Sequence, residues 1–216
     1  KNPIDKAISK NLNTIIDLRH QIHQYPELGN REYKTAKLVA EHLRSLGIEV
    51  ETDIAYTGVV GVLKGNKPGP VVAVRADMDA LPVTEETDLP FKSTVKTTYL
   101  DKEVGVMHAC GHDIHTSVQL GVASVLASMK RSLPGTVKFI FQPAEEGPPP
   151  GEEGGADLML KEGVFDNPKP SAVFGLHTHA ALAVGELGLT IGPAMAAVDQ
   201  FIITIKGKQS HGAYPH

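Results

Sequence analysis

The sequence contains very little of what several kinds of protein depend on. One cysteine in 216 residues excludes an internal disulfide framework and is typical of a reducing compartment. No apolar run approaches the roughly 18 residues that a membrane span needs. The polar start, Lys1–Asp5, also lacks the apolar core of a secretory signal. We therefore expect a cytoplasmic protein with no membrane partner.

An excess of one charge is also missing. Lysine and arginine total 21 against 25 acidic residues, and the formal net charge of −4 comes without a basic block. This balance argues against a nucleic-acid groove and against a membrane-surface patch. A hydrophobic content of 41% and a charged content of 21% are ordinary for a globular protein that buries a core. We expect one or two domains.

Hydrophobic periodicity predicts alternating helices and strands. Helical spacing and stop signals predict helices over 4–24, about 31–46, 113–130 and about 156–162. Short β-branched and apolar runs predict strands over 48–54, 58–63, 71–75, 136–141 and 172–177. Residues 84–102 have no clean period, and we expect a long surface connection there. The alternation favours an α/β sandwich with a mostly parallel central sheet.

The character of the sequence changes near residue 192. Residues 198–206 alternate as an amphipathic strand with one wet face. We expect residues 1–191 to form one domain and 192–216 to begin a smaller α+β domain. The chain stops at His216 without a closing element, so we expect it to be part of a longer polypeptide.

Polar side chains follow several of the predicted strands. In α/β sheets the ligand crevice lies beyond the carboxyl ends of the strands. Asp77 and Asp79 follow one strand, Glu145 and Glu146 follow another, and His177 ends a third. The sequence therefore predicts one shared site at this edge of the sheet.

The single cysteine lies in the richest of these segments. Cys110 and His112 are separated by one glycine, so both reach one site if the backbone turns there. Thiolate and neutral imidazole are preferred ligands of zinc-like ions. A buried inert thiol is the commoner fate of a lone cysteine. The neighbouring His112 and Asp113 favour the ligand interpretation, and Asp113 can also cap the helix that follows.

The adjacent carboxylates of Glu145 and Glu146 repel one another unless a cation lies nearby. One can bind a metal while the other takes a proton from water. The alternative is a solvated acidic turn, which is weakened by the apolar strand directly before the pair.

Two further pairs leave alternatives open. Asp77 and Asp79 share one side of an extended segment, where one could orient a ligand histidine; both could equally be turn or capping residues. His177 is the better ligand candidate of its pair, whereas His179 could bind metal, support a ligand or lie on the surface.

Several segments together resemble a known family. Arg75–Pro82, Met107–Asp113, Phe141–Gly147 and Ser210–His216 resemble signature blocks of the N-acyl-amino-acid amidohydrolases. That group includes hippurate hydrolases, auxin-conjugate hydrolases and related metallo-carboxypeptidases. The blocks occur in family order, and His23–Gly29 is a further match.

The resemblance implies a zinc-peptidase-like catalytic domain with two divalent ions, zinc or manganese, and an inserted lid domain that forms a homodimer. It implies that Glu145 is the general base and that Asp79 orients the site. It implies that His211, in the lid, steadies the oxyanion. The metal ligands carried over by position are Cys110, His112, Glu146 and His177. The wider superfamily usually has a histidine where Asp77 stands. The family supplies a further histidine ligand from a C-terminal segment beyond this chain, so we expect residues 1–216 alone to lack that ligand.

The same resemblance implies hydrolysis of the amide bond of N-acyl amino acids, with hippurate-like or N-acetyl substrates. One alternative is a metallo-carboxypeptidase or dipeptidase that cleaves a peptide bond. Another is a metal-free binding or dimerisation module, against which the intact Cys110, His112, Glu145 and Glu146 argue. The sequence leaves the acyl group, the amino acid and the metal open.

Overall fold

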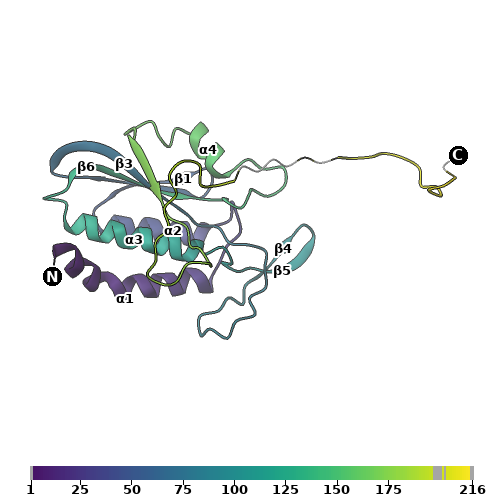
Figure 1. Cartoon of the computed structure of the whole chain (residues 1–216), viewed down its shortest axis with the longest axis horizontal. Coiled ribbons are helices and arrows are strands. Elements are labelled where there is room, and N and C mark those ends of the chain that lie inside the picture. The colour runs from purple at the N-terminus through teal and green to yellow at the C-terminus, as the bar shows by residue number, and fades with distance from the viewer. Residues whose placement is uncertain (1, 197–200, 202, 215–216) are drawn as a thin grey trace. The chain divides into compact units, whose positions relative to one another are not determined.

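The computed structural model describes residues 2–196, 201 and 203–214. The chain divides into two compact units, Lys1–Thr178 and His179–His216. All helices and strands of the described residues lie in the first unit (Figure 1). None of these helices is both long enough and apolar enough to cross a membrane.

The first unit contains the helices and strands that the sequence predicted, together with one additional hairpin. The helices are α1 (Pro3–Gln24), α2 (Tyr33–Ser45), α3 (His112–Ser128) and α4 (Gly155–Lys161). The strands are β1 (Glu49–Ile54), β2 (Gly58–Lys64), β3 (Lys67–Asp77), β4 (Lys96–Tyr99), β5 (Lys102–Gly105), β6 (Pro134–Gln142) and β7 (Ala172–Gly175).

The main sheet has the strand order β1-β2-β6-β3-β7. Strands β6, β3 and β7 run parallel, whereas β1 and β2 are antiparallel to their neighbours. In the parallel part, Asp77 pairs with Gln142, and Arg75 pairs with Gly175. The carboxyl ends of β3, β6 and β7 therefore meet at one edge, as the α/β prediction required.

Helices cover both faces of this sheet (Figure 1). Helices α2 and α3 pack on one face, and α1 packs on α3. The larger core lies there, with Leu43, Leu120 and Phe139 fully buried. A smaller core beneath α4 on the other face includes Ile140 and Met159. Because helix α3 begins at the carboxyl edge of the sheet, the residues of its first turn face the strand ends.

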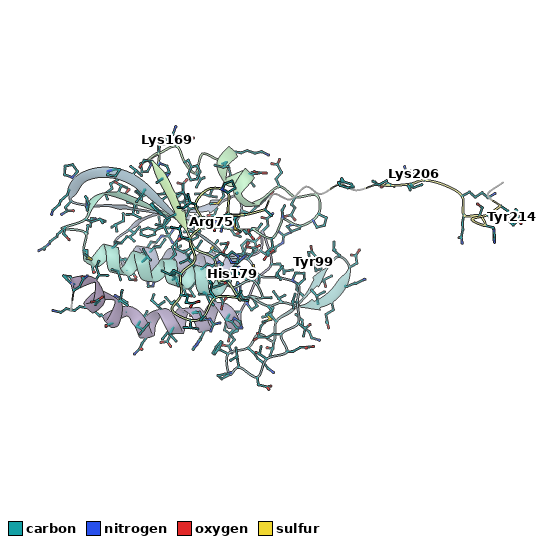
Figure 2. The ribbon with its side chains drawn as sticks, viewed as in Figure 1. Arg75, Tyr99, Lys169, His179, Lys206 and Tyr214 are labelled. Atoms are coloured by element: carbon teal, nitrogen blue, oxygen red, sulfur yellow. The ribbon has the colours of Figure 1, made fainter. Side chains whose placement is uncertain are left out.

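The expectation of a long connection over residues 84–102 is wrong in part. Strands β4 and β5 form a two-stranded hairpin, in which Tyr99 pairs with Lys102 (Figure 2). The turn residues Leu100 and Asp101 have φ values of 50° and 60°. Such a turn normally carries Asn-Gly or Asp-Gly, and this sequence lacks that signal.

Two smaller expectations also need correction. Asp113 does not cap α3, because Gly111 with φ of 91° precedes the helix and Asp113 lies in the first turn. The predicted strand over 198–206 lies partly outside the described residues; Phe201 and residues 203–206, which are described, are not in a strand.

Candidate metal centre

His112 is the central residue of the candidate site. It is fully buried at the start of α3, and its Nδ1 donates to the backbone oxygen of Asp79 at 2.8 Å. That bond leaves Nε2 as the basic nitrogen, and Nε2 has no hydrogen-bond partner among the described residues. Carboxylate oxygens of Asp77, Glu145 and Glu146 lie 3.7, 3.7 and 3.8 Å from Nε2. A buried basic nitrogen facing carboxylates has the arrangement of a ligand around a cation.

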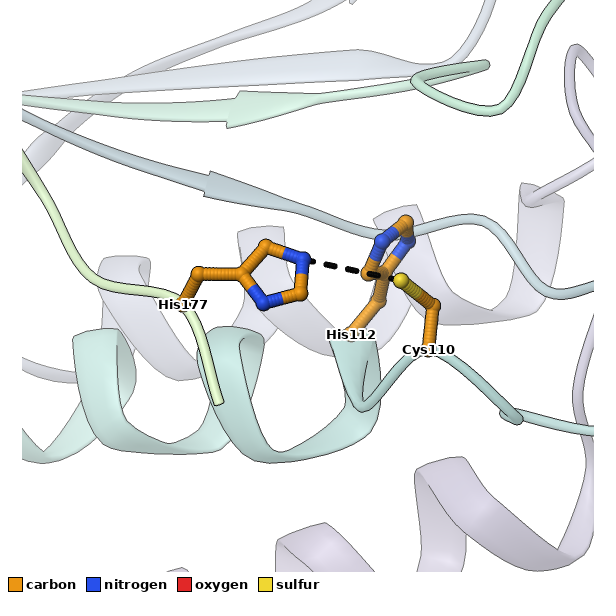
Figure 3. A group of neighbouring side chains, drawn as sticks. All are labelled: Cys110, His112 and His177. Atoms are coloured by element: carbon orange, nitrogen blue, oxygen red, sulfur yellow. Dashed lines mark hydrogen bonds between the residues drawn. The ribbon is translucent and has the colours of Figure 1, made fainter. Parts of the chain in front are cut away.

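Cys110 and His177 complete one donor set with His112. The Sγ of Cys110 lies 3.5 Å from Nε2 of His177 (Figure 3). The other ring nitrogen of His177 donates to the Thr178 carbonyl at 2.7 Å, which leaves Nε2 free to bind. The ligand atoms of the three residues lie within 4.8 Å of one another. Donors about 2.0–2.3 Å from a zinc ion lie at comparable separations from one another.

A second donor set shares the same histidine. Ligand atoms of His112, Glu145 and Glu146 also lie within 4.8 Å of one another. The donors thus extend from a thiol and imidazoles at one end to two carboxylates at the other. The predicted ligands Cys110, His112, Glu146 and His177 are brought together at the carboxyl edge of the sheet.

The protonation of these groups indicates that the pocket is short of positive charge. Burial lowers the pKa of His112, but the hydrogen bond to Asp79 and the surrounding carboxylates outweigh burial and raise it to about 9. Burial and the contact with Glu146 raise the pKa of the Cys110 thiol to about 12. A divalent ion reverses both effects, because it favours the neutral imidazole and the thiolate. The residues present therefore fit a metal ion.

The loop after β6 is held in place by buried carboxylates. Ala144 has a φ of 46°, and its N–H donates to Oε1 of Glu32 at 2.8 Å. The N–H of Glu146 donates to Oδ2 of Asp79 at 3.0 Å. Asp79 thus contacts both His112 and the glutamate loop.

Glu145 belongs to the second donor set and keeps access to solvent. Its side chain is 35% exposed. Burial and the charge of Asp77 raise the pKa of its carboxyl above the ordinary value. A carboxylate whose pKa is raised is a better proton acceptor near neutral pH.

Two predicted site histidines lie in the second unit. His179 and His211 are both exposed, and each accepts a hydrogen bond from a backbone N–H two residues ahead. Among the described residues, neither belongs to a donor set. The role predicted for His211 stays a prediction.

The structure also brings in residues that the sequence analysis missed. His115 lies in a buried donor set with Asp77 and His112. Its spacing from His112, three residues along one helix, was a usable signal. No sequence signal pointed to Glu32, because a glutamate before a helix is usually solvated.

Basic nitrogens and carboxylates gathered at the carboxyl edge of such a sheet define a metal-binding α/β protein. Within that class, the chain belongs to the peptidase family M20/M25/M40, whose sequence profile matches residues 73–215. This membership confirms the family resemblance found in the sequence.

Individual relatives support the same membership. Thermostable carboxypeptidase 1 of Saccharolobus solfataricus is 49% identical over 203 residues, covering 94% of this chain and 48% of that protein. The N-acyl-L-amino acid amidohydrolase of Geobacillus stearothermophilus is 42% identical over 216 residues, covering 100% of this chain and 55% of that protein. This chain thus spans about half the length of the curated relatives it matches.

A solved structure gives the same fold. The YXEP protein of Bacillus subtilis, described as a dinuclear metal binding peptidase from the M20 family, aligns with a TM-score of 0.69 at 42% identity. The match covers 80% of this chain and 45% of that one. The predicted fold class is therefore confirmed.

Proposed function

We propose that the full-length protein hydrolyses the amide bond of N-acyl amino acids with two divalent metal ions. The observation that carries this proposal is the unpartnered Nε2 of His112, which faces carboxylates on one side and lies in a donor set with Cys110 and His177. The name of the Geobacillus amidohydrolase and the dinuclear metal site named for YXEP support it.

The residues that would hold the ions are Cys110, His112, Glu146 and His177. Zinc suits the thiolate and the imidazoles, and manganese suits the carboxylate end of the site. Bound divalent ions would supply Lewis acidity that polarises the scissile carbonyl and makes a nearby water more acidic. Asp79 keeps His112 in the tautomer that binds through Nε2.

Glu145 carries the proton transfers in this proposal. Its carboxylate accepts a proton from the attacking water and returns that proton to the nitrogen of the leaving amino acid. The raised pKa and partial exposure of Glu145 suit both steps, because a raised pKa makes the carboxylate a stronger base and exposure leaves it accessible to water.

Residues 192–216 have a separate proposed role. We propose that residues 1–191 belong to the catalytic domain and that 192–216 begin a lid domain through which two copies form a homodimer. His211 of the lid would donate a hydrogen bond to the oxyanion. The single cysteine, kept as a thiol, fits a protein of the cytoplasm.

Peptide hydrolysis is the second candidate activity. The thermostable carboxypeptidase of Saccharolobus favours it by its name and its 49% identity. Both activities break an amide bond with the same groups, so they differ only in the substrate pocket. A metal-free binding module remains as the non-enzymatic alternative.

A substrate panel separates these candidates. Metal-free full-length protein is reloaded with zinc or manganese and assayed on hippurate, N-acetyl amino acids and dipeptides. The proposal predicts metal-dependent release of free amino acid from the acylated substrates. Preference for dipeptides would favour the peptidase, and no hydrolysis with either metal would leave the binding module. Glu153→Gln, a substitution of an exposed residue in a neighbouring loop, is the matched control for substitutions in the site.

A further inference from the structure

His115 is a buried histidine with both ring nitrogens in use. Its Nδ1 donates to Oδ1 of Asp77 at 2.6 Å. Its Nε2 accepts the backbone N–H of Thr178 at 2.9 Å. Because a backbone N–H only donates, Nε2 is the acceptor and the ring proton lies on Nδ1. Neither nitrogen is left to bind a metal ion.

Both carboxylate oxygens of Asp77 also have partners. Its second oxygen pairs with Nη1 of Arg75 at 2.6 Å, and its backbone oxygen accepts from the hydroxyl of Thr116 at 2.7 Å. Asp77 is therefore fixed from two sides at the end of β3. It serves as a rigid anchor for the His115 ring, and this is the role we assign to an aspartate at a position where the wider superfamily has a histidine.

The other end of this chain of hydrogen bonds is Thr178, directly after His177. The backbone N–H of Thr178 donates to His115, and the Thr178 hydroxyl donates to the backbone oxygen of Cys110 at 3.2 Å. Gly111 allows this approach, since a Cβ there would lie 2.4 Å from the Thr178 hydroxyl oxygen. The segment after β7 is thus attached to the start of α3.

His177 depends on that attachment. It is exposed, and within the part of the chain that the structure describes its ring bonds only the Thr178 carbonyl besides the contact with Cys110. The His115 ring lies against it, with the ring centres 4.5 Å apart. An exposed side chain just beyond a short edge strand keeps its direction only if the backbone beside it is fixed.

We propose that His115 is a positioning residue that links the Asp77 anchor to the Thr178 backbone and so holds His177 beside Cys110. The inference rests on the proposed metal site, which it deepens. It distinguishes His115 from a ligand, although its nitrogens lie close to the metal-binding groups.

Two substitutions separate the two hydrogen bonds of His115. In His115→Gln, the amide oxygen takes the place of Nε2 and still accepts from Thr178. In His115→Asn, the amide nitrogen takes the place of Nδ1 and still donates to Asp77, but the Thr178 bond is lost. The matched control is His42→Asn, which loses a histidine hydrogen bond to Ser124 away from the site.

The readout is Co²⁺ binding by the full-length protein, because Co²⁺ accepts zinc-type ligands and a bound thiolate gives a charge-transfer absorption. We expect His115→Asn to weaken the ion bound by Cys110 and His177 on the order of 10- to 100-fold. We expect His115→Gln to bind closer to wild type. Unfolding midpoints of the metal-free variants check that the two substitutions affect folding alike.

Three results would overturn the inference. Equal, undiminished binding by both variants would remove any role for the Thr178 bond. Loss of one whole ion from both would make His115 a ligand. An equal loss of Co²⁺ affinity in His42→Asn would show that the effect comes from general destabilisation of the fold. The wild type decides the underlying function separately: if it binds no Co²⁺ and hydrolyses nothing, the proposed function fails and this inference fails with it.

Discussion

His112 is the central residue of the site because its two ring nitrogens have different surroundings. One nitrogen donates to Asp79, and the other is buried with no hydrogen-bond partner in the described chain. Leaving such a nitrogen unpaired costs about 1–3 kcal/mol, which a folded protein rarely accepts without a compensating ligand. The positive charge that the pocket imposes on this ring is the charge that a metal ion would supply instead.

Gly111→Ala tests the approach between the start of α3 and the segment after β7. The glycine has a φ of 91°, and an added Cβ would lie 2.4 Å from the Thr178 hydroxyl oxygen. Backbone strain alone costs on the order of 1–3 kcal/mol. We expect a lower midpoint in urea together with weaker Zn²⁺ binding. Gly151→Ala, also at positive φ but with open space around it, should lose stability without losing metal.

Glu32→Gln tests a buried carboxyl whose stability effect depends on pH. Burial, partly offset by hydrogen bonds from Thr57 and Ala144, raises the pKa of Glu32 from 4.5 to about 7. Between these values the folded state binds more protons than the unfolded state, so the free energy of unfolding falls as pH rises. The shift corresponds to on the order of 3 kcal/mol.

The measurement is urea unfolding of wild type and Glu32→Gln at about pH 5 and about pH 8. Glutamine can accept from Ala144 and donate to Thr57, so it keeps both contacts without a charge. Wild type should lose stability relative to the variant at the higher pH. If the stability difference between the two proteins does not change with pH, the pKa of Glu32 is not raised in the folded protein.

At the scale of helices and strands, a buried cluster ties α1 to α3 and to the segment before β4. His23 on α1 lies between two carboxylates, 2.9 Å from Oδ2 of Asp113 and 3.1 Å from Oε1 of Glu85. Arg19 reaches the same Asp113 oxygen at 2.9 Å. The carboxylate at the start of α3 therefore orients the helix through α1 instead of capping it.

Asp113→Asn tests this cluster. The substitution leaves His23 and Arg19 facing a neutral group, and breaking a buried charged pair costs roughly 3–5 kcal/mol. Because Arg19 is partly exposed, we expect the lower end of that range in urea unfolding. Glu103→Gln breaks an exposed pair with Lys96 and should change the free energy by less than about 1 kcal/mol. Equal losses in the two variants would contradict the account.

The sequence predicted most elements because their periodicity is strong, and it predicted the site because polar residues follow buried strands. It could not predict the pairing of His115 with Asp77 or of Glu32 with Ala144, since these contacts join segments 38 and 112 residues apart. Periodicity also predicted an amphipathic α1. Its residues Ile4, Ile8 and Leu12 remain 42–50% exposed, because within the described chain α3 covers only part of that face.

At the scale of the molecule, the candidate ligands come from three separate segments. Cys110 and His112 lie at the start of α3, Glu146 follows β6 and His177 follows β7. A bound ion would connect these segments and stabilise the folded state, by about 2.7 kcal/mol at a free metal concentration of 100 times Kd.

Metal removal should therefore lower the Tm of the full-length protein, and readdition of zinc or manganese should restore it. Amide hydrogen exchange should increase around Thr178 in the metal-free state, because His177 would no longer be held from both sides. An unchanged Tm, in a protein whose metal loss has been verified, would indicate that the ions do not connect these segments.

The proposed function depends most directly on Glu145 acting as a base beside a two-metal site. The most direct test measures metal content and N-acyl-amino-acid hydrolysis of full-length wild type and Glu145→Gln. We expect about two ions per chain in both proteins. We also expect a loss of turnover on the order of 10²- to 10⁴-fold in the variant alone. A variant that retains turnover, or a wild type that has neither metal nor hydrolysis with zinc or manganese supplied, would contradict the claim.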